Sequence, residues 1–260
     1  MKKNKTIKIV NWIGVYTLLT KETKRFCKVY QQTIIAPAFT SLLFFLVISI
    51  AFSSRMNYEF NYINFLAPGL IIMTMMQNAF ANTSSSILGS KMQGNIVDLL
   101  MPPLNANEII FSYVSAAIIR SILVGFLTFL FIYPFTELHL YNIVILCIYS
   151  ILGAILLAFL GLIAGIWSEK FDNMSGITNF IITPLTFLSG TFYTIDRLPE
   201  PFYTISLFNP FYYIIDGFRQ GFQREVSYDL AYGITYLSML NLLIYLVSYR
   251  ILKKGWMLKP

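Results

Sequence analysis

The sequence predicts an all-α integral membrane protein, and three observations lead to that fold class. Hydrophobic residues make up 57% of the 260 residues, charged residues only 12%, and the mean hydropathy is +0.65. A soluble domain carries about 25% charged residues, so this chain has too few to cover a water-soluble surface. Apolar runs of about 20 residues, the length that crosses a bilayer, recur along it. We expect one membrane domain over residues 1–260, with six transmembrane helices.

Residues 11–32 precede the first apolar run and are expected to form an amphipathic helix on the cytoplasmic membrane surface. Apolar residues recur there at helical spacing, and four cations crowd the second half: Lys21, Lys24, Arg25 and Lys28. Such a segment is too charged to cross a membrane but suits its interface. A helix facing a soluble core is disfavoured because nothing else in the chain forms a soluble domain.

Six apolar runs are expected to cross the bilayer, at residues 34–52, 62–81, 109–133, 141–167, 176–193 and 230–251. The fourth run carries Gly153, Gly161 and Gly165, whose spacing suits close helix packing. The third contains Arg120, and a charge at the centre of a span costs about 2.5–3.5 kcal/mol. Arg120 is expected either to line an aqueous path or pair across a dimer, or to snorkel toward the cytoplasm.

Residues 82–108 form the longest polar interruption before the final third of the chain, with a cytoplasmic loop at 84–104. A short helix is expected there, ended by Pro102-Pro103 because proline cannot continue it. Asn105 and Glu108 then have the spacing of a capping box that opens the third span. An apolar stripe without a soluble partner in the same chain usually marks a protein contact. Its members, with the neighbouring cation, are Lys91, Met92, Ile96, Leu99 and Leu100.

Residues 192–229 are aromatic and apolar, yet prolines divide them into pieces too short to cross about 30 Å. We expect two short re-entrant helices at the outer face, since broken backbone at membrane depth must be buried in protein or line a cavity. Asp216 and Arg219 are expected either to pair locally or to make gating contacts. The aromatic residues could form an exit gate or a stacking surface, or simply an interfacial belt. The candidate exit residues are Phe192, Tyr193, Asn209, Pro210, Tyr212, Asp216 and Arg219.

The distribution of cations sets the expected orientation. With both termini in the cytoplasm and six spans, the inner segments hold all twelve lysines plus Arg25 and Arg250. The outer segments then hold only Arg55, Arg197, Arg219 and Arg224. This asymmetry follows the positive-inside rule, and the opposite orientation would reverse it. The net charge of +7 is explained by the same rule, so nucleic-acid binding is not expected.

Several of these motifs together resemble the type 2 ABC transporter permeases. The resemblance lies in Ser189-Gly190-Thr191-Phe192-Tyr193, Leu198-Pro199, Asn209-Pro210-Phe211-Tyr212-Tyr213, Asp216-Gly217-Phe218-Arg219, and the run from Lys91 to Glu108. It covers nearly the whole chain in length, span number and topology. Each motif alone is loose, and their order and spacing make the set specific.

The resemblance implies a membrane subunit of an ABC exporter in the bacterial inner membrane, forming a homodimer that pairs with a separate ATP-binding cassette subunit. Residues around Lys91–Leu100 would dock on that ATPase, and residues 192–229 would lie at the exit. Family members export glycans, teichoic acids, lipids and drugs, so the expected cargo is amphipathic, lipid-linked, glycan or drug-like. No cofactor is expected on this chain: it has no GxxxxGK[ST] loop, and ATP and Mg²⁺ would belong to the partner.

Other classes of function remain as alternatives. An intramembrane enzyme would need paired carboxylates, a Ser–His pair or a metal cluster at membrane depth, and the expected spans contain no histidine and no clear acidic pair. A channel would need a ring-forming polar filter, which is not evident. A membrane scaffold without transport is the main alternative, and only coupling to an ATPase distinguishes it.

Overall fold

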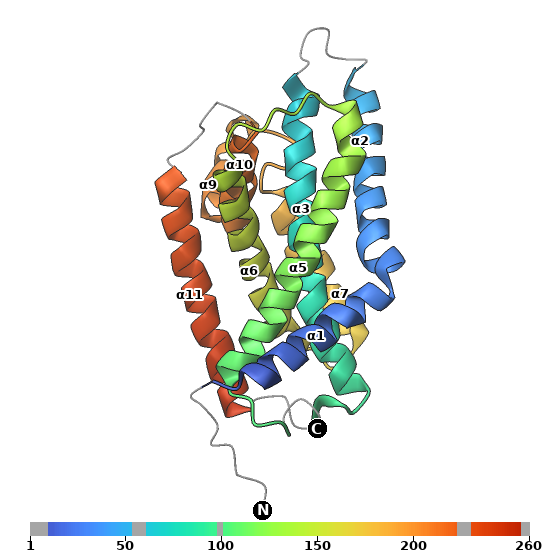
Figure 1. The fold of residues 1–260 in the computed structure, drawn as a ribbon. Helices are drawn as coiled ribbons and strands as arrows, with labels where there is room; N and C mark the ends of the chain where they lie inside the picture. Colours follow the sequence, from blue (N-terminus) through green and yellow to red (C-terminus); the bar gives the residue numbers. More distant parts are fainter. Residues whose placement is uncertain (1–9, 54–60, 98–100, 223–229, 256–260) are drawn as a thin grey trace, which may run out of the picture.

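The computed structural model describes residues 10–53, 61–97, 101–222 and 230–255, and this part of the chain contains helices and no strand. Five of its helices are long and apolar enough to cross a membrane, and Figure 1 shows them side by side. The all-α membrane fold class is therefore confirmed. The bounds of these helices are α2 (Ala36–Ser53), α3 (Asn61–Met92), α5 (Ala106–Ile132), α6 (Ile143–Trp167) and α11 (Leu230–Lys254).

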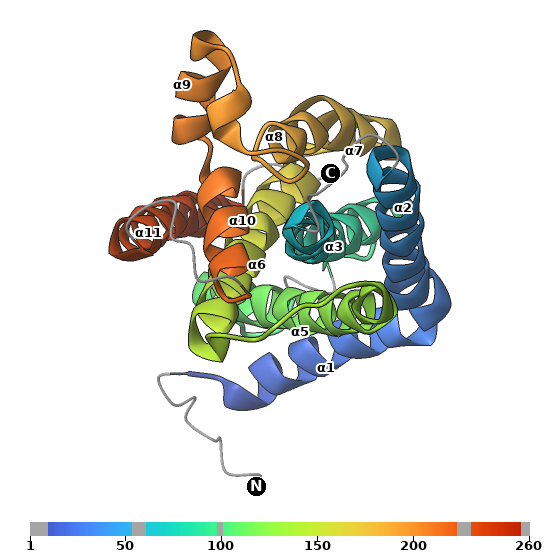
Figure 2. The same ribbon diagram turned by 90° about the horizontal axis from the view of Figure 1, so that it is seen from above.

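Helix α1 (Trp12–Lys28) lies across one end of the bundle, and the C-terminal end of α11 lies at that same end (Figures 1 and 2). The side chain of Asn11 opens α1 by accepting a hydrogen bond from the Gly14 N–H at 3.1 Å. One face buries Val15 and Phe26, whereas Trp12 stays exposed, so the predicted amphipathic helix is confirmed. A π-helical turn, η1 (Gln31–Ile35), then bends the chain into α2.

Helix α3 is 32 residues long, which corrects the expectation that the second span ends near residue 81. The polar run at 82–86 continues the helix because its side chains bond to neighbouring helices. Thr83 Oγ1 donates to the carbonyl of Ala158 at 2.9 Å, and Ser86 Oγ donates to Glu22 at 2.6 Å. Polar groups that find partners inside the bundle need no water, so the run does not have to be a loop.

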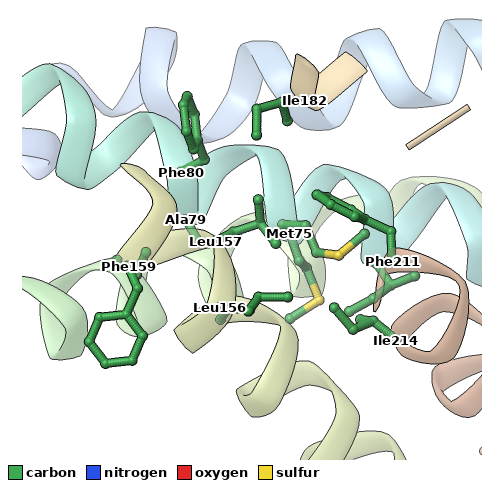
Figure 3. Close-up of a cluster of buried hydrophobic side chains, with 14 of the residues drawn as sticks. Met75, Ala79, Phe80, Leu156, Leu157, Phe159, Ile182, Phe211 and Ile214 are labelled. Carbon is green, nitrogen blue, oxygen red and sulfur yellow. The ribbon is translucent and has the colours of Figure 1, made fainter. Parts of the chain in front are cut away.

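Helices α3 and α6 form the centre of the core, where the glycines of α6 meet α3 directly. A Cβ on Gly161 would lie 2.4 Å from the carbonyl oxygen of Phe80, and one on Gly165 would lie 2.9 Å from that of Ser84. The predicted role of these glycines in close packing is thus confirmed. Figure 3 shows the apolar cluster around this contact, where Met75 and Ala79 of α3 lie near Leu157 of α6.

The third and fourth spans agree with the expectation, whereas the helical stretch at the fifth begins and ends earlier than expected, over residues 171–187. Helix α5 continues into η2 (Tyr133–Phe135) and opens with the predicted capping box, in which Glu108 accepts a hydrogen bond from the Asn105 N–H at 2.8 Å. This stretch consists of three helical pieces of seven, five and five residues that follow one another without a gap. At 1.5 Å per residue they extend about 25 Å, less than the roughly 30 Å hydrocarbon core. They are α7 (Phe171–Ile177), the π-helical η3 (Thr178–Ile182) and α8 (Thr183–Phe187).

The segment before α11 contains the two short helices that its prolines predict, preceded by η4 (Ile195–Arg197). Helix α9 (Glu200–Phe208) projects from the bundle when it is seen from above (Figure 2), and Phe208 is 76% exposed. Helix α10 (Pro210–Gln220) instead packs against α3 and α6, with nearly every residue buried. The prediction of a helix pair holds in the part described, and residues 223–229 of the predicted segment lie outside it.

Candidate functional site

The first candidate region is the turn that follows α3, which was predicted to face an ATPase. Gly94 has φ +72°, a left-handed conformation that glycine adopts at low cost and that turns the chain after Met92. Met92 is 51% exposed and Val97 is 49% exposed, so an apolar surface is present here. Ile96 is buried at 5% exposure and cannot itself touch a partner. The predicted Leu99 and Leu100 lie outside the described residues.

Lys91, which the sequence predicts as part of the docking surface, makes hydrogen bonds within the chain. Its ammonium donates to the carbonyls of Ile166 at 2.6 Å and Ser168 at 2.8 Å. These are carbonyls at the C-terminal end of α6, where a cation is favoured by the helix dipole. Lys91 therefore ties the α3 end to the α6 end. Met92 is the exposed apolar residue of the predicted docking set within the described residues, and Val97, which was not predicted, is exposed beside it.

Helix α1 is attached to α3 through a buried polar cluster. Glu22 is fully buried and its Oε2 accepts from Ser86 at 2.6 Å and from Arg25 at 3.0 Å. The guanidinium of Arg25 also donates to the side-chain oxygen of Asn82 at 3.0 Å and to its carbonyl at 2.8 Å. Since α3 carries the turn at Gly94 on its end, α1 and that turn share one rigid support.

Arg120 lies in the middle of α5, and its side chain does not extend to the membrane surface. It is 7% exposed, and its Nη2 donates to the side-chain oxygen of Asn78 on α3 at 2.9 Å. Asn78 in turn donates to the carbonyl of Thr74 at 3.0 Å. The Nε of Arg120 has no partner among the described residues. Snorkelling, one of the roles expected from the sequence, is therefore not observed; Arg120 instead contacts Asn78, which lines the groove described next.

That groove runs between η1, α2, α3 and α8 and has a volume of about 290 Å³. Its walls are partly polar although they lie within candidate spans. The polar residues lining it are Gln32, Thr40, Ser41, Thr74, Gln77 and Asn78. The sequence reasoning did not find this groove. The available signal was the spacing of Thr74, Gln77 and Asn78, which places all three on one side of a helix.

Two aromatic residues close one end of the groove. Phe187 and Phe192 line it, and their rings stack with centroids 5.2 Å apart. The carbonyl of Phe192 accepts a hydrogen bond from Tyr62 at 3.1 Å, and Tyr193 donates to the carbonyl of Phe187 at the same distance. Of the predicted exit residues, Phe192 is thus the one that lines the groove. Tyr193 does not line it but holds the backbone of Phe187 through its hydrogen bond.

Arg219 holds the outer segment against α3. It is 5% exposed, its Nε donates to the carbonyl of Phe65 at 3.2 Å, and its Nη2 donates to the carbonyl of Gly190 at 3.0 Å. Its guanidinium carbon lies 3.6 Å from the centroid of the Phe65 ring. The predicted local pair with Asp216 is present but longer, at 3.8 Å.

The remaining predicted exit residues lie at the start of α10 and within it, where they pack inside the protein. Asn209 accepts from the Phe211 N–H at 3.0 Å and donates to the carbonyl of Leu185 at 2.8 Å, so it begins α10 and joins it to α8. Pro210 occupies the first turn of α10, where a missing N–H costs little. Tyr212 is 7% exposed, within the packed interior. These residues position the end of the groove and do not line it.

Comparison with known proteins identifies the class to which this membrane bundle belongs. The sequence model of the family described as "ABC-2 type transporter" matches residues 14–222. The chain is also 33% identical over 248 residues to "Inner membrane transport permease YadH" of Escherichia coli K12, covering 94% of this chain and 96% of that protein. It is 25% identical over 203 residues to "Nodulation protein J" of Rhizobium leguminosarum bv. viciae, covering 76% of each chain.

The chain belongs to the ABC-2 type transporter family, as a membrane permease subunit. This family lacks the ATPase domain, so the chain is not itself the ATP-hydrolysing enzyme and requires a partner ATPase subunit. The family resemblance predicted from the motifs is confirmed. Among the described residues, no group of histidine, cysteine, aspartate or glutamate could hold a metal ion, and Cys27 and Cys147 are both free.

Proposed function

We propose that the chain is the permease of an ATP-driven exporter in a bacterial inner membrane, with both termini in the cytoplasm. The observation that carries the proposal is the polar groove of about 290 Å³ at membrane depth, whose aromatic end is formed by Phe187 and Phe192. Polar side chains within spans are costly and usually serve a pathway. The inner-membrane location is supported by the name of the Escherichia coli relative, and the direction of transport rests on the family resemblance.

The mixed lining of the groove supports an amphipathic cargo. Amide and hydroxyl groups such as Gln77 and Thr40 suit a polar part, and Phe44 and Phe187 suit an apolar part. Arg120 donates to Asn78 behind the wall and adds positive potential without facing the groove directly. A glycan, lipid-linked or drug-like molecule combines polar and apolar parts in this way.

A second copy of the chain would complete the path. The groove is bordered by α2, whose spanning window is only 17% buried within one chain, and by α8, which follows η3, where Phe180 is 83% exposed. Such apolar helix faces need either lipid or a protein partner. We propose a homodimer in which the two grooves face each other. In it, α7, η3 and α8 form the sixth crossing, while α9 and α10 form a re-entrant pair at the exit.

The ATPase subunit would dock on the turn after α3, over Met92 and Val97. This surface is apolar and exposed, and Lys91 and the Glu22–Arg25 cluster fix it to α6 and α1. A movement of the ATPase at this turn would therefore shift α3 as a rigid helix. The residues of α3 that line the polar groove would move with it.

The test is co-expression of the chain with an ATPase subunit from the same genome, followed by pull-down and ATP hydrolysis in lipid. We expect the wild type to retain the ATPase and Met92→Asp to lose it, because a charge then replaces the apolar contact. Gln93→Asp places the same charge on the next exposed residue and should retain most binding. A wild type that holds no ATPase under any condition would contradict the exporter and favour a membrane scaffold. Equal loss in both variants would show a charge effect and move the docking site elsewhere.

A further inference from the structure

A second groove, formed by α1, α5, α6 and α11, is separate from the polar one. Its volume is about 430 Å³. Two walls are apolar, with Val114 and Ile118 on α5 and Ile155 and Phe159 on α6. Lipid tails are as apolar as these side chains, so lipid is the natural occupant of such a groove between spans.

The length of the groove matches one leaflet of a bilayer. Its lining on α5 extends from Asn107, in the first turn of the helix, to Ile118. Eleven residues at 1.5 Å each give about 16 Å. Half of a hydrocarbon core is about 15 Å. The groove therefore suits one acyl chain of the leaflet next to α1 better than a molecule that crosses the membrane.

The end of the groove beside α1 has the features of a headgroup level. Trp12 lines it and is 65% exposed, and tryptophan favours the membrane–water interface. Tyr245 of α11 also lines it, with its hydroxyl donating to the Asn107 side chain at 2.9 Å. Both residues combine an apolar body with a polar tip, which suits the boundary between tail and headgroup.

A cation continues this surface toward the end of the bundle. Tyr245 and Tyr249 stack with ring centroids 6.4 Å apart, and the ammonium of Lys253 lies 5.5 Å from the Tyr249 ring centroid. The spacing of four residues puts all three on one face of α11. Lys253 is exposed, so its charge is available to a phosphate. An ammonium near the membrane surface attracts anionic lipid by about 1 kcal/mol.

Glu108 also lines the groove, but its negative charge repels a bound anion only weakly. It is 5% exposed. Its two carboxylate oxygens accept from the Asn11 N–H at 2.7 Å and the Asn105 N–H at 2.8 Å. These donors offset much of the negative charge within the protein. Among the described residues that line or continue this groove, Lys253 then carries the exposed charge.

We propose that this groove binds one anionic phospholipid, with an acyl chain along α5 and the phosphate at Lys253. The site joins α1 and α11 through the lipid, at the helix ends that border the proposed ATPase side. The proposal depends only on the membrane setting of the bundle, so it can fail while the exporter function stands, and the reverse.

The test is native mass spectrometry of the full-length protein extracted from vesicles that contain equal amounts of phosphatidylglycerol and phosphatidylcholine. We expect the wild type to retain one phosphatidylglycerol in preference to phosphatidylcholine. Lys253→Gln should lower that retention about fivefold, the factor that corresponds to the loss of about 1 kcal/mol. Lys254→Gln, which removes a neighbouring exposed charge on another side of α11, should leave it unchanged.

Ser115→Phe tests the tail half of the site, since Ser115 lines the groove and is partly exposed. It should reduce retention of both lipids, because the ring occupies the space of the chain. Three results would overturn the proposal: no preference for phosphatidylglycerol in the wild type, equal losses in the two lysine variants, or a retained mass that is not a phospholipid. Because both lysine variants are exposed substitutions, they remain informative even where Ser115→Phe fails to fold.

Discussion

Helices α2 and α3 cross the same bundle side by side, yet they use opposite chemistry. The more apolar α2 has 17% of its spanning window buried, whereas the more polar α3 has 72% buried. In a soluble protein the order would be reversed, because water drives apolar residues inside. In a membrane the outside is also apolar, so polar residues mark the helix that packs against its neighbours and apolar residues mark the one that faces lipid or a partner.

The polar groups of α3 are used in contacts with three different helices. Thr83 bonds to α6, Ser86 to α1, and Asn78 to α5. Helix α2 makes few such bonds, although Ser41 and Thr74 share a hydrogen bond across the polar groove. The comparison therefore separates α3, which is bonded to several neighbouring helices, from α2, which is mostly exposed, and each prediction below tests one of the two helices.

The largest effect is expected at the contact between α3 and α6. Gly161→Ala would bring a Cβ to 2.3 Å from Thr83 Oγ1 and 2.4 Å from the Phe80 carbonyl oxygen. Backbone cannot move aside as a flexible side chain can, so we expect destabilisation above about 3 kcal/mol, the upper end for overpacking. Gly89→Ala is the matched control, since no atom lies within 4 Å of its Cβ. It should stabilise by up to about 1 kcal/mol. Unfolding in detergent measures both, and equal behaviour would refute the packing argument.

Removing a buried side chain of α3 should have the next largest effect on the free energy of unfolding. Leu66 is fully buried, so Leu66→Ala leaves a space that its neighbours fill only in part. We expect a loss of about 3 kcal/mol, within the range of about 2–5 kcal/mol for such truncations. Chemical unfolding in mixed micelles is the measurement. A loss below about 1 kcal/mol would mean that α3 is not the rigid centre of the bundle.

The buried polar contact should cost less, and it should be partly reversible. Asn78→Leu leaves the Arg120 guanidinium without the acceptor it has on α3, and a hydrogen bond to a charged group is worth about 1.5–3 kcal/mol. We expect a loss of about 2 kcal/mol. The double variant Asn78→Leu/Arg120→Met removes both partners and should be more stable than Asn78→Leu alone. Strict additivity of the two changes would show that the side chains act independently.

The smallest effect is expected on the outer face of α2. Leu43 is 48% exposed, so Leu43→Ala should change the unfolding free energy of the isolated chain by less than about 0.5 kcal/mol. The same substitution at Leu66 should cost several times more. If Leu43→Ala instead weakens a dimer in crosslinking experiments, the exposed face of α2 is a subunit contact.

Much of this fold could be predicted from the sequence, because apolar length and helix caps are local signals. Helix α5 begins where the Asn105–Glu108 capping box predicts, and the glycines of α6 pack as their spacing indicates. The extension of α3 past residue 81 could not be read in this way. A serine-rich stretch resembles a loop unless the partners of its side chains are known, and those partners lie on α1 and α6.

The candidate site was predicted less completely than the fold. Of the predicted exit residues, Phe192 lines the groove, whereas Asn209 and Arg219 hold backbone segments together. Lys91 bonds to the end of α6, which no spacing within its own loop could indicate. The groove itself depends on residues from four separate segments. Its partial signal, the helical spacing of Thr74, Gln77 and Asn78, becomes meaningful only once α2 is known to lie opposite.

Water access along α2 and α3 tests the central claim most directly. In a chain with Cys27 and Cys147 changed to serine, single cysteines would be introduced at Gln77 and Thr40 in the groove and at Val47 on the apolar face. They would be treated with a water-soluble maleimide in the presence of the ATPase subunit. We predict that Gln77→Cys and Thr40→Cys react and that Val47→Cys does not. Reaction at Val47→Cys alone would contradict the account, because the aqueous path would then follow the apolar face of α2.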